Sequence, residues 1–567
     1  MTHITIHFVL ASSFLLGSAL AQPNVVILIG DDMHPDRFGF LNDPRAKTPS
    51  LDWLASQGSV WTNCWLPQSI CRPTLATIMT GQQPRTHGIQ FGSSAQLSDS
   101  STFLTTMRED GYRVRIDGGK WWDPPGDHFD ERGYDEPVGN EVTSRYFRQD
   151  IFYTLDFIRR MSASSTPFVL VSMPSVPHLP HDPPQEQRDR FPLSSIPVPT
   201  WSNNPSQYRQ REQDYLAMTA WYDQHVMTII GALRVNNVLE NTIVIFVSDN
   251  GWATGRAAKS SPYAAGNRSP LIIFGPGFAV ATSNEFIQLM DLAPTILKRC
   301  GLPPLPNAEG MDFLDSSYAP PGIVFGFTQR AEPLAVWSQR TDGIRFIHWL
   351  RAVEQDDRHR FLEYTNTAFA PARLKGEEEL YDIVADVDEQ ADLIADPAHT
   401  QDVSILRAAT EQWWGETLTP RPPKTTDIID DGDSRFSTSG NWVHNTNPFR
   451  PAFGGDIHYS AAGNGADQAV WGFSALAPGQ YQVYVTWNGT TNRATNSPFT
   501  ITADSSPPIA VLVNQESEPH CDHTVANRPF QKLGSAVTVG AGSIVIRLTD
   551  DADEFVIADA VLIVKED

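Results

Sequence analysis

Two short pairs of oxygen-bearing residues each follow a run of apolar residues. Asp31-Asp32 comes directly after residues 24–30, and Asp249-Asn250 comes after residues 242–247 and one serine. Carboxylate and amide oxygens without nitrogen or sulfur partners favour Ca²⁺ or Mg²⁺ over zinc. Each pair alone is also typical of a helix cap or a turn. Together they predict a divalent-metal site with Asp31, Asp32, Asp249 and Asn250 as its ligands.

The elements that must position this site alternate along the chain. Apolar runs typical of buried strands cover residues 24–30, 167–172, 242–247 and 271–274. Helical periodicity covers residues 49–57, 75–80 and 215–233. The alternation predicts an α/β domain with a central, mainly parallel sheet. Ligands of such sheets lie beyond the carboxyl ends of the strands, which is where both acidic pairs fall.

A third candidate segment lies between the two pairs. Residues 69–81 read Ser-Ile-Cys-Arg-Pro-Thr-Leu-Ala-Thr-Ile-Met-Thr-Gly. This segment resembles the sulfatase signature, Cys-x-Pro-Ser-Arg followed by a helix of small residues and Thr-Gly. Other sulfatase landmarks stand in family order: Asp31-Asp32, Gly118-Gly119-Lys120-Trp121, Pro177-His178, Ser248-Asp249-Asn250-Gly251, Lys259, Arg268, Pro270, residues 290–295 and residues 379–382. The resemblance spans nearly four hundred residues, from about Asn24 to Trp414, and the ordered set is more specific than any single motif.

The resemblance implies an alkaline-phosphatase-like fold and hydrolysis of a sulfate ester on a carbohydrate. In sulfatases a dedicated formylglycine-generating enzyme oxidises the signature Cys, and the hydrated aldehyde, bound to the cation, attacks sulfur. By resemblance, Cys71 is the modified nucleophile, and Lys120 and Lys259 grip sulfate oxygens. His178 contacts the sulfate or the leaving oxygen, with His181 as the competing histidine. A purely structural interpretation of Cys71 is a buried thiol.

Several positions depart from the sulfatase pattern. Leu75 stands where the signature has Arg, and Trp122 stands where the Gly-Lys-Trp-His motif has His. Gln82 and Ala264 replace a usual Arg and Glu. Each donor missing from an anion site costs on the order of a hundredfold in rate. Three hypotheses follow: a sulfatase with a rearranged pocket, a phosphodiester or phosphonate hydrolase of the same superfamily, and a catalytically impaired protein that binds glycans.

A second domain follows a change in composition near Leu418. Residues 419–426 are rich in Pro and Thr and predict an extended linker between a domain at 22–418 and one at 427–567. Alternating runs at 481–487, 542–548 and 555–564 predict a β-sandwich. This part is similar to the golvesin-type domain, related to the carbohydrate-binding module of xanthan lyase, through Ile428 to Asp431, Gly440-Asn441-Trp442, residues 466–471, residues 476–481 and Asp559-Ala560-Val561. Trp442, Trp471 and Trp487 either stack on sugars or fill the core.

The charge, the cysteine count and the N-terminal residues limit which classes of partner and which cellular compartment are expected. A net charge of −24 argues against a nucleic-acid or anionic-membrane partner. Four cysteines are too few for a disulfide scaffold, and their pairing is not readable from the sequence. Residues 1–21 contain a short apolar stretch that ends in Ala19-Leu20-Ala21, which predicts a cleaved signal peptide and a secreted or periplasmic protein. No later segment is long and apolar enough to predict a membrane span.

Overall fold

The computed structural model describes residues 22–89, 97, 102–118, 150–199, 204–252, 259–329, 333–351, 375–420, 426–433, 435–446, 452–540 and 542–566. The chain folds into two compact units, the first ending at Pro321 and the second beginning at Gly322, while residues 261–263 belong to the second. Lys120, Trp122, the predicted signal peptide and most of the predicted linker lie outside the described residues. The domain boundaries at residues 418 and 427 stay predictions.

A seven-stranded sheet forms the centre of the first unit within the described residues, in the order β3-β4-β1-β5-β6-β2-β7. The strands are β1 (Asn24–Gly30), β2 (Ser59–Trp65), β3 (Arg113–Gly118), β4 (Phe168–Met173), β5 (Thr242–Ser248), β6 (Arg268–Phe274) and β7 (Ala281–Gln288). Strands β3, β4, β1 and β5 are mutually parallel, and β6 runs antiparallel to both β5 and β2. The sheet is therefore mainly parallel, as the apolar runs predicted.

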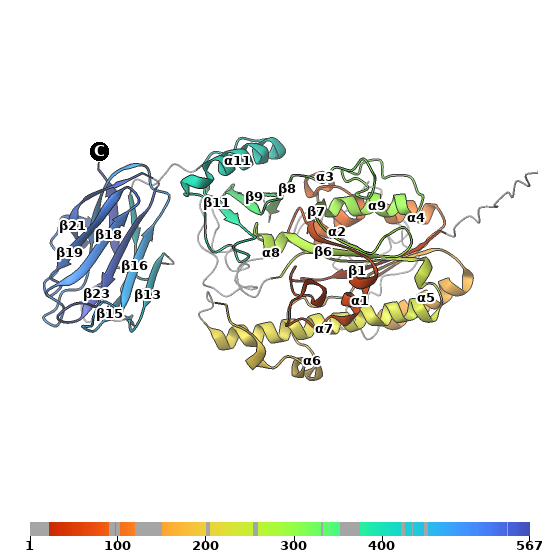
Figure 1. Cartoon of the computed structure of the whole chain (residues 1–567), viewed down its shortest axis with the longest axis horizontal. Helices are drawn as coiled ribbons and strands as arrows, with labels where there is room; N and C mark the ends of the chain where they lie inside the picture. The colour runs from red at the N-terminus through yellow and green to blue at the C-terminus, as the bar shows by residue number, and fades with distance from the viewer. Residues whose placement is uncertain are drawn as a thin grey trace, which may run out of the picture. The chain divides into compact units, whose positions relative to one another are not determined.

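Helices cover both faces of this sheet (Figure 1). On one face lie α2 (Cys71–Thr80), α4 (Phe103–Glu109) and α9 (Leu292–Arg299). On the other face lie α1 (Pro49–Gln57), α5 (Asp150–Ser164) and α7 (Pro205–Val235). Strand β1 is apolar on both sides because Val25 and Ile27 pack into the first layer and Val26 and Leu28 into the second. The shorter helices are α3 (Pro84–His87), α6 (Gln185–Asp189) and α8 (Ala264–Asn267).

Two elements extend or orient differently from the sequence pattern. Helix α7 begins at Pro205, ten residues before the predicted start, because Asn204 caps its N-terminus through a bond from the Gln207 amide at 3.1 Å. Its first turns are polar, so apolar periodicity could not reveal them. Strand β6 covers the predicted run at 271–274 and runs antiparallel to β5, with Val244 opposite Phe274 and Phe246 opposite Ile272. Lys259 lies beside Asp32, and Arg268, the first residue of β6, pairs with Asp36.

The second unit begins with a four-stranded antiparallel sheet among the described residues, in the order β11-β10-β9-β8. Its strands are β8 (Ile323–Gln329), β9 (Pro333–Arg340), β10 (Ile344–Trp349) and β11 (Glu378–Asp382). Helix α11 (Thr400–Trp414) packs on it through Val403, Leu406 and Trp414. The landmark at residues 379–382 is therefore part of a strand.

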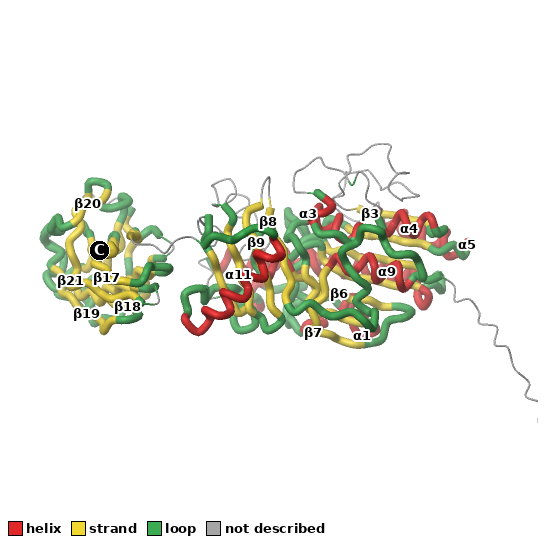
Figure 2. Tube along the Cα trace, turned by 90° about the horizontal axis from the view of Figure 1, so that it is seen from above, coloured by secondary structure: helices red, strands yellow, loops and turns green. Residues whose placement is uncertain are grey.

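The C-terminal region consists of strands, as Figure 2 shows for its described part. Two five-stranded sheets have the orders β12-β24-β17-β21-β20 and β13-β16-β22-β18-β19, and a three-stranded sheet has the order β14-β15-β23. The bounds are β12 (Thr426–Ile429), β13 (Phe436–Ser439), β14 (Val443–Asn445), β15 (Ile457–Ser460), β16 (Gln468–Phe473), β17 (Gly479–Val485), β18 (Ser497–Ala503), β19 (Ser506–Val513), β20 (His523–Val525), β21 (Arg528–Val539), β22 (Ile544–Thr549), β23 (Val556–Ala558) and β24 (Val561–Lys565). The all-β prediction is confirmed, although the run at 555–564 forms two strands.

The tryptophans of this region are mainly core residues. Trp471 and Trp487 are 1% and 0% exposed, so neither can stack on a sugar. Their indole N–H groups donate to the backbone oxygens of Asp559 at 3.2 Å and Ser517 at 2.8 Å. Trp442 is half-buried against the same core. The core interpretation is therefore correct for Trp471 and Trp487.

Two chain-wide features concern bilayers and cysteines. Within the described residues, no helix combines the length and apolarity needed to cross a bilayer. No disulfide joins the cysteines, of which Cys64, Cys71 and Cys300 are buried and Cys521 is exposed.

Candidate active site

The two acidic pairs meet at the carboxyl edge of the central sheet. Strands β1 and β5 are parallel neighbours, and their register pairs Gly30 with Ser248. The residues that follow, Asp31 and Asp249, therefore leave the sheet side by side. The Asp249 amide donates to the Gly30 oxygen at 3.1 Å, which continues the ladder one step beyond the strands. Strand pairing thus brings together residues that are more than two hundred positions apart in the sequence.

The four predicted metal ligands form one connected and fully buried group. Asp31, Asp32, Asp249 and Asn250 are each 0% exposed. The Asp32 amide donates to Asp249 Oδ1 at 3.1 Å, and Asn250 Nδ2 donates to Asp32 Oδ1 at 2.7 Å. Gly251, the next residue, is required by close backbone approach, because a Cβ there would lie 1.7 Å from the Ala265 oxygen. The arrangement fixes both loops against each other.

The donor set of this group fits a hard divalent cation. Asp249 Oδ2 and Asn250 Oδ1 are buried and accept no hydrogen bond from any described residue. Burial first, and then the charges of Asp31 and Asp32, raise the pKa of Asp249 to about 8. Buried carboxylates that crowd together in this way are stabilised by a bound cation. The group could therefore hold a metal ion through its unsatisfied oxygens.

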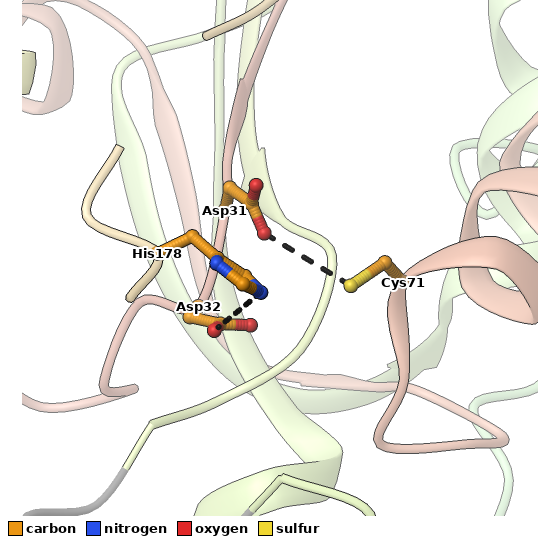
Figure 3. A group of neighbouring side chains, drawn as sticks. All are labelled: Asp31, Asp32, Cys71 and His178. Carbon is orange, nitrogen blue, oxygen red and sulfur yellow. Dashed lines mark hydrogen bonds and ion pairs between the residues drawn. The ribbon is translucent and has the colours of Figure 1, made fainter. Parts of the chain in front are cut away.

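Cys71 lies beside the acidic group but belongs to a different element. It is the first residue of α2, and its Sγ lies 4.0 Å from Asp31 Oδ1 (Figure 3). The Thr74 hydroxyl donates to the backbone oxygens of Gln68 and Ile70, each at 2.9 Å, and so shapes the turn before the helix. The Ser260 amide donates to the Ser69 oxygen at 2.8 Å, which ties this turn to the loop of Lys259. Cys71 thus lies at a helix N-terminus, where negative charge is favoured.

Two cationic or ionisable side chains converge on Asp32. Lys259 Nζ donates to Asp32 Oδ1, and His178 Nε2 lies 3.6 Å from Asp32 Oδ2 (Figure 3). Burial opposes the charge on Lys259, but the carboxylate of Asp32 and its negative neighbours raise the pKa of this lysine well above its usual value. The candidate ligand atoms of Asp31, Asp32, Cys71 and His178 all lie within 4.8 Å of one another. The structure thus brings together seven of the eight predicted site residues, and Lys120 lies outside the described ones.

The loop of His178 is tied to the metal ligands through its backbone. The Asp31 amide donates to the Val176 oxygen at 3.3 Å, and the peptide bonds before Pro177 and Pro180 are cis. His178 Nδ1 lies 2.7 Å from the Leu179 backbone oxygen, which can only accept, so Nδ1 carries the proton. Nε2 is therefore the nitrogen that faces the site.

The replaced signature position does not face the site as a donor. Leu75 is 0% exposed and belongs to the apolar layer between α2 and the sheet, with Ile27 and Ile78 among its members. Gln82 is also buried and donates to the Asn307 backbone oxygen at 2.9 Å. The departures at Leu75 and Gln82 are therefore built into the packing, whereas the departure at Trp122 lies outside the described residues.

Beside the site, Tyr215, Trp252 and His181 form a group of packed rings that the sequence analysis did not predict. The Tyr215 hydroxyl accepts from the His34 amide at 2.6 Å and lies 3.5 Å from the Asp32 backbone oxygen. The His181 ring packs edge-on against Trp252, with ring centroids 5.4 Å apart, and lies 5.6 Å from the ring of Tyr215. Burial lowers the pKa of His181 to about 4. Only His181 carried a signal in the sequence, its position three residues after His178.

Comparison with known families agrees with this geometry. Residues 23–302 match the Sulfatase family, and residues 427–565 match the Golvesin C-terminal domain. Over these two ranges the chain therefore matches a sulfatase domain followed by a Golvesin C-terminal domain. Both resemblances predicted from the sequence are confirmed.

Individual relatives are distant. Iduronate 2-sulfatase of Mus musculus is 24% identical in an alignment that covers 51% of this chain and 71% of that protein. An ulvan-active sulfatase of Formosa agariphila is 24% identical in an alignment that covers 51% of this chain and 64% of that protein. An arylsulfatase of Clostridium perfringens is 22% identical in an alignment that covers 68% of this chain and 93% of that protein.

Solved structures with the same fold include enzymes with different esters. One is an enzyme in complex with its substrate D-glucosamine-2-N,6-O-disulfate, with a TM-score of 0.57 and 17% identity over 70% of this chain and 98% of that one. Another is a phosphonate monoester hydrolase of Agrobacterium radiobacter, with a TM-score of 0.55 and 16% identity over 69% of this chain and 95% of that one. At such identities the likeness establishes the fold.

Proposed function

We propose that the first domain hydrolyses sulfate esters of a carbohydrate, with Cys71 in its formylglycine form as the nucleophile. The observation that carries this proposal is the convergence of Cys71, His178 and Lys259 on the buried pair Asp31 and Asp32. A nucleophile, a proton carrier and a fixed positive charge around metal ligands are the components that sulfate transfer needs.

The metal ion of this site is proposed to be Ca²⁺. Asp31, Asp32, Asp249 and Asn250 offer only oxygen ligands, and two of those oxygens are buried without a hydrogen-bond donor among the described residues. When bound, such an ion supplies Lewis-acid stabilisation of negative charge on oxygen. The ligands sit on two strand ends held in register, so the site is preorganised by the sheet rather than by flexible loops.

The nucleophile requires a change at Cys71. Oxidation of the thiol to an aldehyde, followed by hydration, places two hydroxyl oxygens where Sγ now faces Asp31 Oδ1 at 4.0 Å. One hydroxyl attacks the sulfur of the ester, and the alcohol leaves. The second hydroxyl then reforms the aldehyde and releases sulfate. The N-terminus of α2 stabilises the developing negative charge on these oxygens.

Lys259 and His178 have separate roles in this proposal. Lys259 stays charged because the carboxylates around it outweigh its burial, so it can offset charge on the sulfuryl oxygens. His178 holds a proton on Nδ1 through the Leu179 oxygen, and its Nε2 faces the site. A second proton on Nε2 is the one that it can deliver to the leaving alcohol.

The substrate class rests on the relatives and on the second domain. An ulvan-active sulfatase and two iduronate 2-sulfatases are among the similar proteins, and a Golvesin C-terminal domain follows the sulfatase domain. We therefore propose a sulfated polysaccharide or oligosaccharide as substrate and an exported protein that is cleaved after Ala21. N-terminal sequencing of protein recovered outside the cytoplasm tests the export: Gln22 as the first residue supports it, and an intact Met1 contradicts it.

Peptide mass spectrometry tests the nucleophile. Trypsin does not cut the Arg72-Pro73 bond efficiently, so residues 48–85 leave as one peptide that contains both Cys64 and Cys71. After co-expression with a formylglycine-generating enzyme and alkylation, the proposal expects an alkylated Cys64 and an aldehyde at Cys71. Because Cys64 is buried in the core, it serves as the internal control. Alkylation of both cysteines would overturn the formylglycine mechanism.

Glycan binding without turnover is the second candidate function. It is favoured by Leu75, which fills the apolar layer at the position of the signature Arg and leaves one donor fewer near the anion. Titration of sulfated oligosaccharides against the full chain separates the two functions. Saturable binding with no released sulfate would support binding alone, whereas released sulfate excludes it.

A further inference from the structure

A second acidic group lies in the C-terminal domain, far along the chain from the candidate active site. Strands β12 and β24 are antiparallel, and their register pairs Ile428 with Leu562 and Ile429 with Val561. Continued by two residues, this register places Asp430 opposite Ala560 and Asp431 opposite Asp559. The C-terminal cluster, defined as Asp430, Asp431 and Asp559, is thus assembled by the first and last strands of the domain.

Neighbouring strands add two histidines to the rim of this cluster. Strand β15 pairs with both β14 and β23, which places His458 opposite His444 on one side and opposite Ala558 on the other. The two imidazole rings stack with centroids 4.4 Å apart. His458 Nδ1 lies 2.7 Å from Asp431 Oδ2, and His444 Nε2 lies 2.7 Å from Asp456 Oδ2. The histidines therefore hold carboxylates in place from the side.

The C-terminal cluster has a single arginine, Arg528, whose charge acts on Asp559 from beyond ion-pair distance among the described residues. Asp431 and Asp559 are 3% and 1% exposed, and one oxygen each of Asp430, Asp431 and Asp559 lie within 4.8 Å of one another. Asp431 Oδ1 is buried and accepts no hydrogen bond from any described residue, whereas its Oδ2 is held by His458. Within the described part of the chain, no lysine or arginine forms an ion pair with these three carboxylates.

The loop before the cluster packs directly against its carboxylates. The Phe453 amide lies 3.2 Å from both side-chain oxygens of Asp559. Gly454, whose φ is +69°, approaches Asp430 closely, since a Cβ there would lie 2.0 Å from Asp430 Oδ2. A larger residue at position 454 would therefore push against this carboxylate.

We propose that Asp430, Asp431 and Asp559 bind a hard divalent cation, Ca²⁺, that joins the first strand of the C-terminal domain to its last strand. Oxygen ligands favour this ion, and the unsatisfied Asp431 Oδ1 points to a ligand inside the cluster rather than at its rim. His458 orients Asp431 from outside, as a hydrogen-bond partner behind a metal ligand does. The ion stabilises the folded domain because it links β12 and β24, which are adjacent strands from the two ends of the domain's sequence.

Calcium stoichiometry of the full chain tests the proposal. After removal of metals and dialysis against Ca²⁺, Asp431→Asn should bind one ion per chain fewer than the wild type, measured by inductively coupled plasma mass spectrometry. Asp551→Asn, which removes an exposed carboxylate from the neighbouring turn, is the matched control and should bind as the wild type does. Asp249→Asn removes a candidate ligand of the metal site in the first domain, so its calcium content reports that site separately. A negative result for that site does not affect the comparison of Asp431→Asn with the wild type. Equal calcium content in Asp431→Asn and wild type overturns the proposal.

Stability gives an independent readout with opposite signs in two buffers. In a chelator, Asp430→Asn should raise the unfolding temperature of the C-terminal domain, because it removes one of three carboxylates whose oxygens lie within 4.8 Å of one another. In Ca²⁺ the order should reverse, since the variant loses the gain from binding. Terbium luminescence excited through tryptophan gives a third readout, because the Trp471 indole donates to the Asp559 backbone oxygen. Zn²⁺ binding that is lost in His444→Ala but kept in Asp430→Asn would overturn the carboxylate site in favour of a histidine site.

Discussion

The two acidic groups of this chain differ in what surrounds them. At the sheet edge, Asp31, Asp32, Asp249 and Asn250 lie beside Cys71 and the charged Lys259. In the C-terminal cluster, Asp430, Asp431 and Asp559 have only histidines at the rim and no lysine or arginine in an ion pair among the described residues. Both groups are built by strand register, and both contain buried oxygens without hydrogen bonds.

This difference distinguishes a metal site that can act on an anionic ester from one that only stabilises the fold. A cation held only by carboxylates is neutralised by them and has little charge left to attract an anion. An additional fixed positive charge and a nucleophile beside the ligands turn such a site toward an anionic ester. Lys259 and Cys71 are the side chains that make this difference, and the predictions below remove or exchange the features that distinguish the two groups.

The largest expected effect follows removal of the nucleophile. Cys71→Ala should lower the rate of aryl sulfate hydrolysis by roughly a thousandfold or more, because no other group supplies the attacking oxygen. Its calcium content should match the wild type. Cys300→Ala is the control, since Cys300 is a buried thiol of the same domain outside the site. A Cys71→Ala enzyme with more than a tenth of the wild-type rate would contradict the assigned role.

Restoring the family residue at position 75 should harm the fold rather than help the site. Leu75 is fully buried among apolar side chains, so Leu75→Arg would bury a guanidinium without a partner, at a cost of about 3 kcal/mol or more. Urea unfolding measures this loss. Leu75→Met, which keeps the volume, should cost less than about 1.5 kcal/mol. A stable Leu75→Arg protein with a higher rate would show that the position opens to the pocket.

Removing the fixed charge should slow turnover while sparing the metal. Lys259→Met should reduce the hydrolysis rate on the order of a hundredfold, because one donor to the sulfuryl oxygens is lost. Asp32 then loses the lysine that competes with the metal ion, so calcium binding should be retained or tightened. Lys298→Met, at an exposed position on α9, is the control for loss of a lysine. Loss of calcium together with activity would instead make Lys259 a structural partner of the ligands.

The smallest effect concerns pH and contrasts the histidines of the two domains. His87 is buried in the first domain, and burial lowers its pKa to about 4. Its Nδ1 accepts from the Ile89 amide at 3.1 Å, so protonation breaks that bond. A folded-state pKa below the unfolded value near 6.5 means that stability is complete above pH 6.5 and is lost as the pH falls to about 4, by up to about 3 kcal/mol.

Variants at position 87 isolate this contribution. His87→Asn keeps an acceptor for the Ile89 amide and does not titrate, so unfolding free energy should fall less steeply between pH 6.5 and 4 than in the wild type. An identical slope in His87→Asn and the wild type would show that the histidine is not protonated on unfolding in this range.

Local patterns were enough to predict much of the first domain. The run at 24–30 and the periodicity at 49–57 coincide with β1 and α1, because one strand is apolar on both faces and one helix has a clear apolar side. The parallel register of β1 and β5 explains why Asp31 and Asp249, predicted from strand ends alone, lie together. The helical pattern at 75–80 covered only part of α2, so Cys71 was found through the family motif rather than through periodicity.

Other features depend on contacts that local patterns do not encode. The C-terminal cluster combines Asp431 with Asp559, and only the register of β12 against β24 reveals that they face each other. The antiparallel direction of β6 depends on the path of the connection from β5. Tyr215 lies near the site because it belongs to the long helix α7. The first turns of this helix are polar, so apolar periodicity did not reveal where the helix begins. Tertiary packing decided each of these cases.

Sulfate release from sulfated polysaccharides is the most direct test of the central proposal. The wild-type chain, matured with a formylglycine-generating enzyme and supplied with Ca²⁺, is incubated with a panel of sulfated glycans, and free sulfate is measured by ion chromatography beside Cys71→Ala. We predict time-dependent sulfate release from at least one glycan by the wild type and none above background by the variant. Equal release by both proteins, or none by an enzyme whose Cys71 is shown to be formylglycine, would contradict it.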